Sequence, residues 1–288
     1  AKGIDLAHRA GKRVCVTVNI LAHQKHLVGL AKHLRLLAKL RPDALVVADP
    51  GVLSLVKKYC PKIKIHLSTQ ANCTNGEAVK FWYRQGVRRV ILGREVTLAE
   101  IKGIHRSCPA MELEYFVHGA MCMAYSGRCF LSAEFLGRSA NLGDCAQPCR
   151  WSWDVSLKAA GHDEEFDLVC EKHGSYLLNS KDLCLIKYLP QLAAAGITSY
   201  KIEGRAKSAY YLATVVSAYS LAIKQPRRRQ YLFSELNDKL VHRGYSTGFL
   251  LTKKGEQNIA NAHNASAWEF CGEVIAKHST GVLVKVHN

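Results

Sequence analysis

The chain has 288 residues, of which 48% are apolar and 22% are charged. This ordinary globular usage excludes a disordered chain, a collagen and a coiled coil. Its 40 Lys and Arg residues outnumber 23 Asp and Glu residues, so the formal net charge is +17. A folded protein this basic attracts polyanions, most commonly nucleic acid, although a merely basic surface is the alternative. Charges interrupt the apolar runs, so no transmembrane helix and no membrane partner are predicted.

Short runs of β-branched and apolar residues alternate along the chain with stretches of helical period. A glycine- and cysteine-rich segment over residues 119–152 interrupts this alternation, which then resumes. We predict strands at Val14–Ile20, Ala44–Ala48, Ile63–Ser68, Val87–Leu92, Glu112–Val117, Tyr176–Asn179 and Ser199–Ile202, and helices at Asp5–Ala10, Leu27–Leu40, Val52–Tyr59, Gly76–Gln85, after Thr97, Leu183–Ala195 and Ala209–Lys224.

Repeated βα units predict a parallel sheet, either a (β/α)8 barrel or an open doubly wound sheet. The absence of a Gly-x-Gly-x-x-Gly motif after a strand disfavours a dinucleotide-binding fold. We expect an α/β, (β/α)-barrel-like parallel domain over residues 1–229. A linker and the start of a small C-terminal β domain follow over residues 230–288. Because the predicted strands fall one short of a closed barrel, we expect the barrel to be incomplete at its N-terminus.

Polar side chains follow most of the predicted strands. Parallel α/β folds place active residues at these carboxyl ends, although turn and cap residues of similar type are the alternative. Lys201, Glu203 and Arg205 follow a single strand, and this mixture of charges suits an anionic ligand. Glu203 would orient the cations or handle a proton, and His118 is the other catalytic candidate. The candidates at the strand ends are Asn19, Asp49, Gln70, Arg94, His118, Lys201, Glu203 and Arg205.

The chain has eleven cysteines, an odd number in a long chain. This argues against a secreted disulfide scaffold, so we expect a reducing, cytoplasmic compartment. Thiolates bind soft metals, and four suffice for a [4Fe–4S] cluster. Structural zinc usually uses pairs spaced Cys-x2–4-Cys, and here only Cys145 and Cys149 fit. Composition therefore favours iron–sulfur over zinc and over buried free thiols. The candidate ligands are Cys122, Cys129, Cys145 and Cys149, with Cys170 and Cys184 as alternates.

The cysteine segment resembles the signature of the collagenase-like peptidase family U32, in the run Glu114-Tyr-Phe-Val-His-Gly-Ala-Met-Cys-Met-Ala-Tyr-Ser-Gly-Arg-Cys-Phe-Leu-Ser132. Further matches extend this resemblance over most of the chain. They are His66-Leu-Ser-Thr-Gln70, Leu92-Gly-Arg-Glu95, Cys145-Ala-Gln-Pro-Cys-Arg-Trp151, Asn179-Ser-Lys-Asp-Leu183 and Lys201-Ile-Glu-Gly-Arg205.

The resemblance implies a barrel-like α/β domain, followed in longer members by a small β-barrel domain. Older members of the family were named proteases. Others are oxygen-independent hydroxylases with a [4Fe–4S] cluster that act on tRNA, rRNA or ubiquinone precursors, and the RNA-modifying members depend on prephenate. The intact Cys-x3-Cys-Arg-Trp and Asn-Ser-Lys-Asp-Leu runs are most similar to the branch that forms 5-hydroxyuridine at the tRNA wobble position. The implied partners are tRNA or rRNA and a small dicarboxylate.

Two other hypotheses remain beside the RNA hydroxylase. A collagenase-type protease needs a nucleophile and a base, or an activated water. Gly244-Tyr-Ser-Thr-Gly248 matches a nucleophile elbow by its letters, but no helical pattern follows, so we interpret it as a turn. A non-catalytic RNA-binding protein with a structural metal is the third hypothesis.

The hydroxylase hypothesis accounts for three features together. A cluster would carry redox chemistry that side chains cannot perform. Arg94, Lys201 and Arg205 would grip a dicarboxylate such as prephenate, and the basic surface would hold the RNA backbone. The aromatic side chains Tyr125, Trp151 and Trp153 would stack a flipped-out base, with core packing as the alternative.

Overall fold

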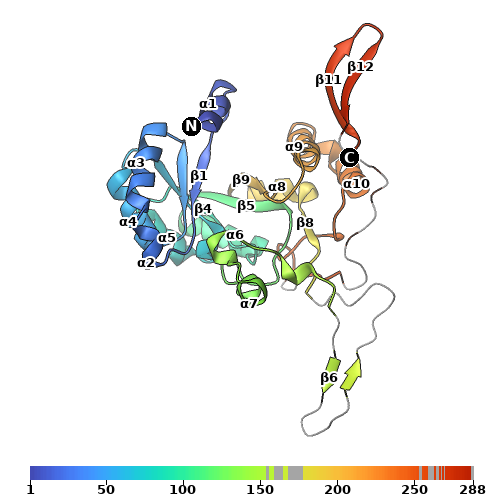
Figure 1. The fold of residues 1–288 in the computed structure, drawn as a ribbon. Helices are drawn as coiled ribbons and strands as arrows, with labels where there is room; N and C mark the ends of the chain where they lie inside the picture. The colour runs from blue at the N-terminus through green and yellow to red at the C-terminus, as the bar shows by residue number, and fades with distance from the viewer. Residues whose placement is uncertain are drawn as a thin grey trace.

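The computed structural model describes residues 1–153, 156–158, 165–167, 178–252, 255–258, 263, 266, 268 and 270–286. These residues form an α/β fold with a mostly parallel sheet, as predicted (Figure 1). The strands follow the order β1-β2-β3-β4-β5-β8-β10, and β9 also pairs with β5. Their bounds are β1 Cys15–Val18, β2 Ala44–Val47, β3 Lys64–Leu67, β4 Arg89–Ile91, β5 Glu112–Gly119, β8 Asp182–Cys184, β9 Ile197–Ile202 and β10 Tyr245–Ser246.

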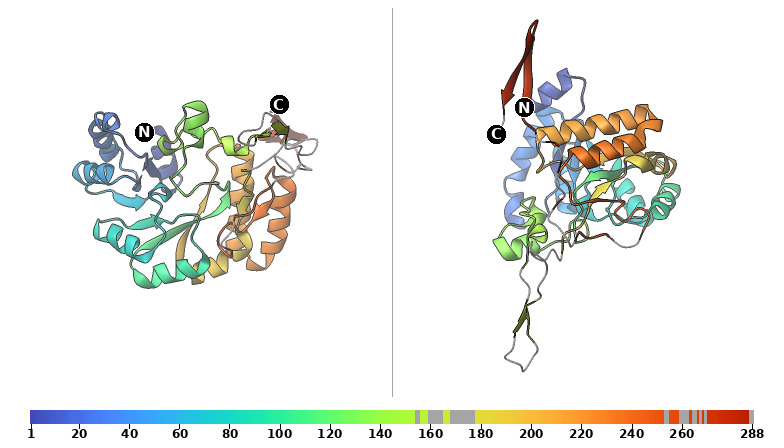
Figure 2. Two further views of the ribbon diagram at one scale, coloured as in Figure 1. Left: turned by 90° about the horizontal axis from the view of Figure 1, so that it is seen from below. Right: turned by 90° about the vertical axis from the view of Figure 1, so that its right-hand side faces the viewer.

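The helices lie outside an arc of strands, which the left view of Figure 2 shows most clearly. Several begin at a polar cap: Asp49, Asn75, Thr97 and Ser208 each accept a hydrogen bond from a backbone N–H of the first turn. The helices are α1 Lys2–Arg9, α2 Gln24–Leu27, α3 Leu30–Leu40, α4 Pro50–Tyr59, α5 Gly76–Arg84, α6 Leu98–Ser107, α7 Leu131–Leu136, α8 Leu189–Ala194, α9 Ala209–Lys224 and α10 Arg229–Lys239.

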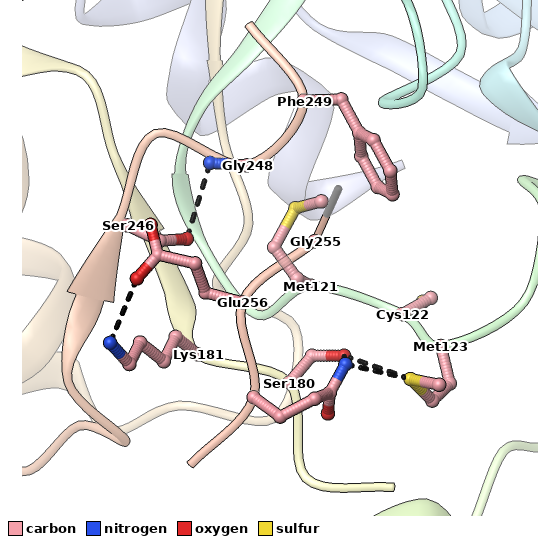
Figure 3. Close-up of a pocket in the computed structure, with 11 residues that line it drawn as sticks. Met121, Cys122, Met123, Ser180, Lys181, Ser246, Gly248, Phe249, Gly255 and Glu256 are labelled. Atoms are coloured by element: carbon pink, nitrogen blue, oxygen red, sulfur yellow. Dashed lines mark hydrogen bonds and ion pairs between the residues drawn. The ribbon is translucent and has the colours of Figure 1, made fainter. Parts of the chain in front are cut away.

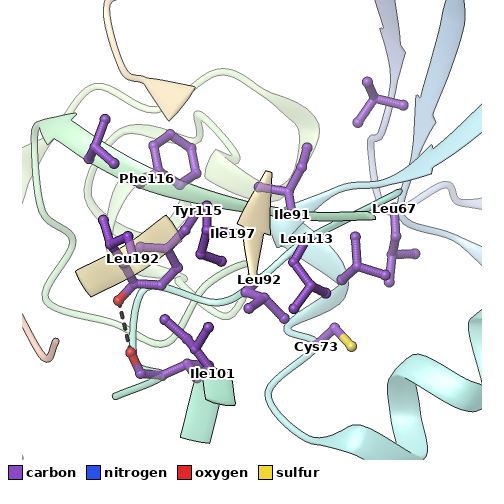
Figure 4. Packing of buried hydrophobic residues seen from close by; sticks show 14 of the residues in the cluster. Leu67, Cys73, Ile91, Leu92, Ile101, Leu113, Tyr115, Phe116, Leu192 and Ile197 are labelled. Atoms are coloured by element: carbon purple, nitrogen blue, oxygen red, sulfur yellow. Dashed lines mark hydrogen bonds between the residues drawn. The ribbon is translucent and has the colours of Figure 1, made fainter. Parts of the chain in front are cut away.

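The hydrophobic core lies between the sheet and the outer helices. Leu67, Leu92 and Leu113 are fully buried on one face of the strands and pack with Ile101 of α6 (Figure 4). Burying side chains of this size stabilises the fold by about 1.5–3 kcal/mol each. Tyr115 on the same face donates its hydroxyl to the carbonyl of Val96 at 2.8 Å. The loop between β4 and α6 is therefore fixed against the sheet.

The segment predicted as a helix over Leu183–Ala195 begins instead as a strand. Asp182–Cys184 forms β8, in which Leu183 and Cys184 pair with Gly119 and His118 of β5 in antiparallel fashion. A single turn of 3-10 helix follows, and α8 starts only at Leu189, next to Pro190. Proline suits the first turn of a helix because its missing N–H has no partner there anyway. The buried pairing with β5 therefore overrides the helical period of residues 183–188.

The sheet continues past residue 229, where the sequence predicted the barrel-like domain to end. Helix α10 buries Leu232 and Leu236 in the same core. Strand β10 then pairs with β8 in parallel register. The backbone N–H of Leu98 donates to the carbonyl of Leu250 at 2.9 Å, which attaches this segment to α6. Residues 230–250 thus belong to the main fold.

Two hairpins lie outside the main sheet. Strands β6 (Ser156–Lys158) and β7 (Glu165–Asp167) pair after the cysteine segment, and β11 (Gly272–His278) pairs with β12 (Gly281–Val286) (Figure 1). The β structure predicted within residues 230–288 is thereby found over Gly272–Val286. Tyr176, Leu177 and Cys170 lie outside the described residues. Within the described part, no helix is long and apolar enough to cross a membrane.

A buried ion pair ties the segment after α10 to β8, and its loss should be costly. Arg243 donates to Asp182, and each side chain is 6% exposed. We expect Arg243→Ala to lower the free energy of unfolding by about 3–5 kcal/mol, because Asp182 keeps a buried charge without its partner. Urea unfolding measures the change. The control is Lys80→Ala, which breaks an exposed pair with Glu77 and should cost less than about 1 kcal/mol. Equal losses in the two variants would contradict the prediction.

Candidate active site

The carboxyl ends of the parallel strands bring polar side chains together at one edge of the sheet. Asn19, after β1, donates its Nδ2 to Ser68 Oγ at 2.9 Å. The backbone N–H of Gln70, after β3, donates to the same hydroxyl oxygen at 3.2 Å. The Gln70 Oε1 atom is buried and has no hydrogen-bond partner among the described residues. The structure therefore joins Asn19 and Gln70 through Ser68 and leaves Gln70 with an available acceptor.

Two predicted cations converge on one aromatic ring at this edge. The Arg94 guanidinium carbon lies 3.8 Å from the centroid of Phe116, and Lys201 Nζ lies 5.6 Å from the same centroid. Tyr115 holds the Arg94 backbone by donating to its carbonyl at 3.2 Å. Arg94 Nε is buried without a partner in the described part of the chain. A planar guanidinium with an unused donor suits a carboxylate ligand.

A charged network on the inner face of the sheet supports Lys201. The buried Glu114 carboxylate of β5 accepts from Lys201 Nζ at 3.2 Å, from Ser199 Oγ at 2.8 Å and from Arg89 Nη1 at 3.1 Å. Neither Glu114 nor Arg89 was among the predicted site residues. Their signal was present in the sequence as charged residues inside otherwise apolar strands, since charged side chains are rarely buried without partners.

Glu203 and Arg205 are committed to contacts within the protein. The Glu203 side chain accepts from the backbone N–H of Arg205 at 3.1 Å, which closes the turn after β9. Arg205 Nη1 donates to the carbonyl of Gly143 at 2.9 Å. Arg205 thus attaches the cysteine segment to the turn after β9, and Glu203 closes that turn.

His118 lies in the core rather than in an open site. It is 1% exposed, and its ring nitrogens lie 3.4 Å from the Tyr219 hydroxyl and 3.5 Å from the Tyr245 hydroxyl. Burial lowers the pKa of His118 to about 3, against an opposing effect of Asp182. A neutral imidazole held between tyrosine hydroxyls is a structural arrangement, so the geometry gives His118 no direct access to a ligand.

The cysteine segment lies across the strand ends because glycine lets its backbone approach them closely. At Gly119 an added Cβ would fall 2.7 Å from the carbonyl oxygen of Glu203, and at Gly127 it would collide with the carbonyl of Gln70. Both glycines have positive φ, a conformation that L side chains rarely adopt. The carbonyl of Asn141 accepts from the backbone N–H of Leu21, after β1, at 3.2 Å. The segment therefore touches the ends of three strands.

All four predicted ligand cysteines are free thiols on this segment. Burial raises the pKa of Cys149, and the nearby Cys122 and Cys145 raise it further, whereas Arg150 lowers it. Cys122 and Cys145 are thus each within electrostatic range of Cys149. Among the described residues, however, no three Cys, His, Asp or Glu side chains are grouped closely enough to hold a metal ion.

The donor chemistry of the segment, four cysteine thiols, fits a soft metal or an iron–sulfur cluster. The alternate ligand Cys184 lies elsewhere. It is buried in the core, 3.9 Å from the Tyr219 hydroxyl, and burial raises its pKa to about 11. A thiol in this environment is a poor metal ligand because the thiolate is disfavoured. The other alternate, Cys170, lies outside the described residues.

Comparison with known proteins agrees with the cysteine pattern. The model of peptidase family U32 matches residues 1–260. The chain belongs to peptidase family U32. The tRNA hydroxylation protein P of Haemophilus influenzae is 37% identical, over 99% of this chain and 72% of its own length. The protein of the same name from Escherichia coli is also 37% identical, over 94% and 70%. The 23S rRNA 5-hydroxycytidine C2501 synthase of Escherichia coli is 35% identical, over 89% of this chain and 39% of its own length.

Family U32 is named as a peptidase family, and a serine peptidase would need an activated nucleophile such as Ser246 of the Gly-x-Ser-x-Gly run. Tyr245 and Ser246 form β10, and Ser246 Oγ accepts from the backbone N–H of Gly248 at 3.2 Å. A turn follows where a nucleophile elbow requires a helix. His242 directs its Nδ1 to the N–H of Gly244 and its Nε2 to the carbonyl of Asn237. This supports the interpretation of the Gly-x-Ser-x-Gly run as a turn, in which both ring nitrogens of His242 contact backbone groups.

Two cavities open beside Cys122 in this U32 chain. The serine cavity has a volume of about 280 Å³ and lies between Cys122 and Ser246 (Figure 3). The arginine cavity has a volume of about 440 Å³ and contains Arg94. The predicted aromatic side chains differ in position. Tyr125 lines the arginine cavity and is 66% exposed, whereas Trp153 packs with its ring centroid 5.0 Å from that of Phe135 on α7.

Buried histidines should make the U32 fold sensitive to mild acid. Burial lowers the pKa of His66 to about 4 and that of His118 to about 3. The unfolded chain therefore binds more protons below about pH 6.5, and stability present above that pH is lost as the pH falls. Each histidine should cost about 2 kcal/mol between pH 7.5 and pH 5.

Urea unfolding at the two pH values measures this loss. We expect His118→Gln to reduce the pH dependence, and His33→Gln, an exposed histidine on α3, to leave it unchanged. An unaltered pH dependence in His118→Gln would show that this histidine does not titrate on unfolding.

Proposed function

We propose that this U32 protein is an RNA-modifying hydroxylase that converts a tRNA wobble uridine to 5-hydroxyuridine. The observation that carries the proposal is the position of the cysteine segment across the carboxyl edge of the sheet. This edge is where parallel α/β enzymes hold their reacting groups, and Arg94 and Lys201 lie there with Phe116 between them. Relatives named as tRNA and rRNA hydroxylating proteins support the same reaction class. A tRNA substrate implies a cytoplasmic protein.

Cys122, Cys129, Cys145 and Cys149 would hold a [4Fe–4S] cluster in this proposal. Such a cluster supplies the electron transfer that amino-acid side chains cannot. The chain provides compensating positive charge, since Arg138 lies within electrostatic range of Cys145, and Arg150 within range of Cys149 and Cys122. These arginines favour the thiolate forms that a metal requires.

The co-substrate in this proposal is prephenate, a small dicarboxylate. Arg94 would bind one carboxylate through its unused Nε and the rest of the guanidinium fork. Lys201 would supply a second positive charge, held in place by Glu114. Gln70 and Asn19 line the same edge of the sheet and offer amide groups for the polar substituents of the ligand.

The RNA would lie over the same edge. The net charge of +17 supplies the general attraction to phosphate. The exposed ring of Tyr125 and the partly exposed ring of Trp151 lie on the cysteine segment and offer stacking surfaces for unpaired bases.

The direct test is the reaction itself. Protein prepared without oxygen is incubated with prephenate and tRNA that lacks the modification, and the nucleosides are separated and weighed by mass spectrometry. Prephenate-dependent 5-hydroxyuridine is the expected product. Cleavage of gelatin without any 5-hydroxyuridine would favour the protease hypothesis. RNA binding with zinc in place of iron and no product would favour a structural metal in an RNA-binding protein.

Ligand identity is tested by the iron content of cysteine variants. Native protein should contain about four irons and four sulfides per chain, with visible absorbance that dithionite bleaches. Cys122→Ala and Cys129→Ala should each lose most of the iron, because a cluster with three thiolates is poorly held. Cys184→Ala should retain it, since that thiol lies in the core. Full iron content in either loop variant would contradict the assignment.

The carboxylate site is tested by the kinetics of prephenate use. Arg94→Gln should raise the KM for prephenate by at least about tenfold, because a hydrogen bond to a charged group is worth about 1.5–3 kcal/mol. Arg88→Gln is the matched control, since Arg88 lies over the Tyr83 ring outside the site. A KM that Arg94→Gln leaves unchanged would place the dicarboxylate elsewhere.

A further inference from the structure

The serine cavity and the arginine cavity share one wall. Met121, Cys122, Met123 and Phe249 line both of them. Figure 3 shows Cys122 and Met123 on the opposite side of the serine cavity from Ser246 and Lys181. A proposed cluster ligand therefore stands between two spaces, and each can hold a different reactant against the same thiol.

The serine cavity contains an unused hydrogen-bond acceptor. Gln257 Nε2 donates to Met123 Sδ at 3.0 Å and to Ser180 Oγ at 3.3 Å, which orients the amide. Gln257 Oε1 is buried and has no partner among the described residues. A buried acceptor left unpaired costs about 1–3 kcal/mol, so a ligand with an N–H donor is favoured there. Ser246 accepts from the N–H of Gly248, and its own hydroxyl hydrogen remains as a donor.

The charges of the two cavities differ. In the serine cavity Lys181 Nζ and Glu256 Oε2 are paired at 2.8 Å, so their charges cancel and a neutral ligand is suited. The arginine cavity contains Arg94 with its unused Nε. Its two carboxylates accept hydrogen bonds from neutral groups and keep their charge: Glu95 accepts from Ser126, and Glu100 accepts from Thr97 in a capping box. Of the two cavities, the arginine cavity is the one with an unused, buried cationic donor for a carboxylate, the Nε atom of Arg94.

The size and the apolar lining of the serine cavity further restrict which neutral ligand it can bind. A volume of about 280 Å³ is near the lower limit of about 300 Å³ for ligand pockets, so it suits one small ring system. Met121 and Phe249 supply adaptable apolar contacts for the faces of such a ring. A ring with an N–H donor beside carbonyl acceptors fits these walls, and uracil is such a ring.

We propose that the serine cavity receives the extruded uracil base of the RNA, with its N3–H donated to Gln257 Oε1 and a ring carbonyl accepting from the Ser246 hydroxyl. This inference rests on the proposed function and adds the position of the base to it. Enzymes that modify a nucleobase commonly take it out of the stack into a pocket of this kind. The base and the dicarboxylate would then lie on opposite sides of Cys122.

A photo-crosslinking experiment tests the position of the base without requiring turnover. An anticodon stem-loop RNA with 4-thiouridine at the wobble position is bound to the protein and irradiated, and the attached peptides are identified by mass spectrometry. Attachment within residues 246–248 or 255–257, which line the serine cavity and not the arginine cavity, supports the proposal. Attachment only at other peptides overturns it. This readout stays informative if the protein forms no 5-hydroxyuridine, in which case the proposed reaction fails and the base site is judged by the crosslink.

A second measurement tests the N3–H donor of the uracil base. Native protein should reject RNA carrying 3-methyluridine at the target, because the methyl group replaces the N3–H that pairs with Gln257. We expect Gln257→Leu to lose about 10- to 100-fold in kcat/KM for uridine and to lose most of this discrimination. Gln85→Leu, at a half-buried glutamine that accepts a hydrogen bond from Lys57 outside both cavities, should behave as native protein. Equal discrimination in native protein and Gln257→Leu, with iron content unchanged, would overturn the proposal.

Discussion

The candidate site depends on the close approach of the cysteine segment to the ends of the strands. Gly119 lies against the carbonyl of Glu203, and Gly127 lies against that of Gln70, where any side chain would collide. Both positions also require positive φ. A segment of this length would otherwise be a surface loop of variable position. Anchored at β3 and β9, it instead holds its thiols over the same edge as Arg94 and Lys201.

The inner face of the sheet also contributes to the site at this edge, because a charged network there holds Lys201. Glu114 is buried among Arg89, Ser199 and Lys201, which together satisfy both of its carboxylate oxygens. A buried ionic network of this kind is weak evidence for stability, because desolvation offsets much of its electrostatic energy. The network instead restrains the Lys201 side chain. Because Glu114 holds it, Lys201 has fewer rotamers to lose when a ligand binds.

The sequence was sufficient for the α/β class, because strand and helix periods alternate and polar caps mark several helix starts. It was insufficient for residues 183–188, where burial of β8 against β5 overrides a helical period. The strand-end rule selected Arg94 and Lys201, which both lie near the Phe116 ring, but the same rule selected His118, which is buried in the core. The position of a residue at a strand end does not show on which face of the sheet its side chain lies. The strand-end rule also misses Gln257, which joins the site from a segment far along the chain.

The two cavities beside Cys122 differ in the kind of ligand that each can bind. The proposed reaction brings together two reactants of different charge, a dicarboxylate anion and a neutral base. The Lys181–Glu256 pair leaves the serine cavity without an unpaired cation among the described residues, whereas Arg94 in the other cavity has an unused donor for a carboxylate. In the proposed arrangement the uracil N3–H pairs with Gln257 Oε1, a buried acceptor of the serine cavity that has no partner among the described residues. The two reactants would thus be distinguished by a cationic donor in one cavity and by a neutral acceptor in the other.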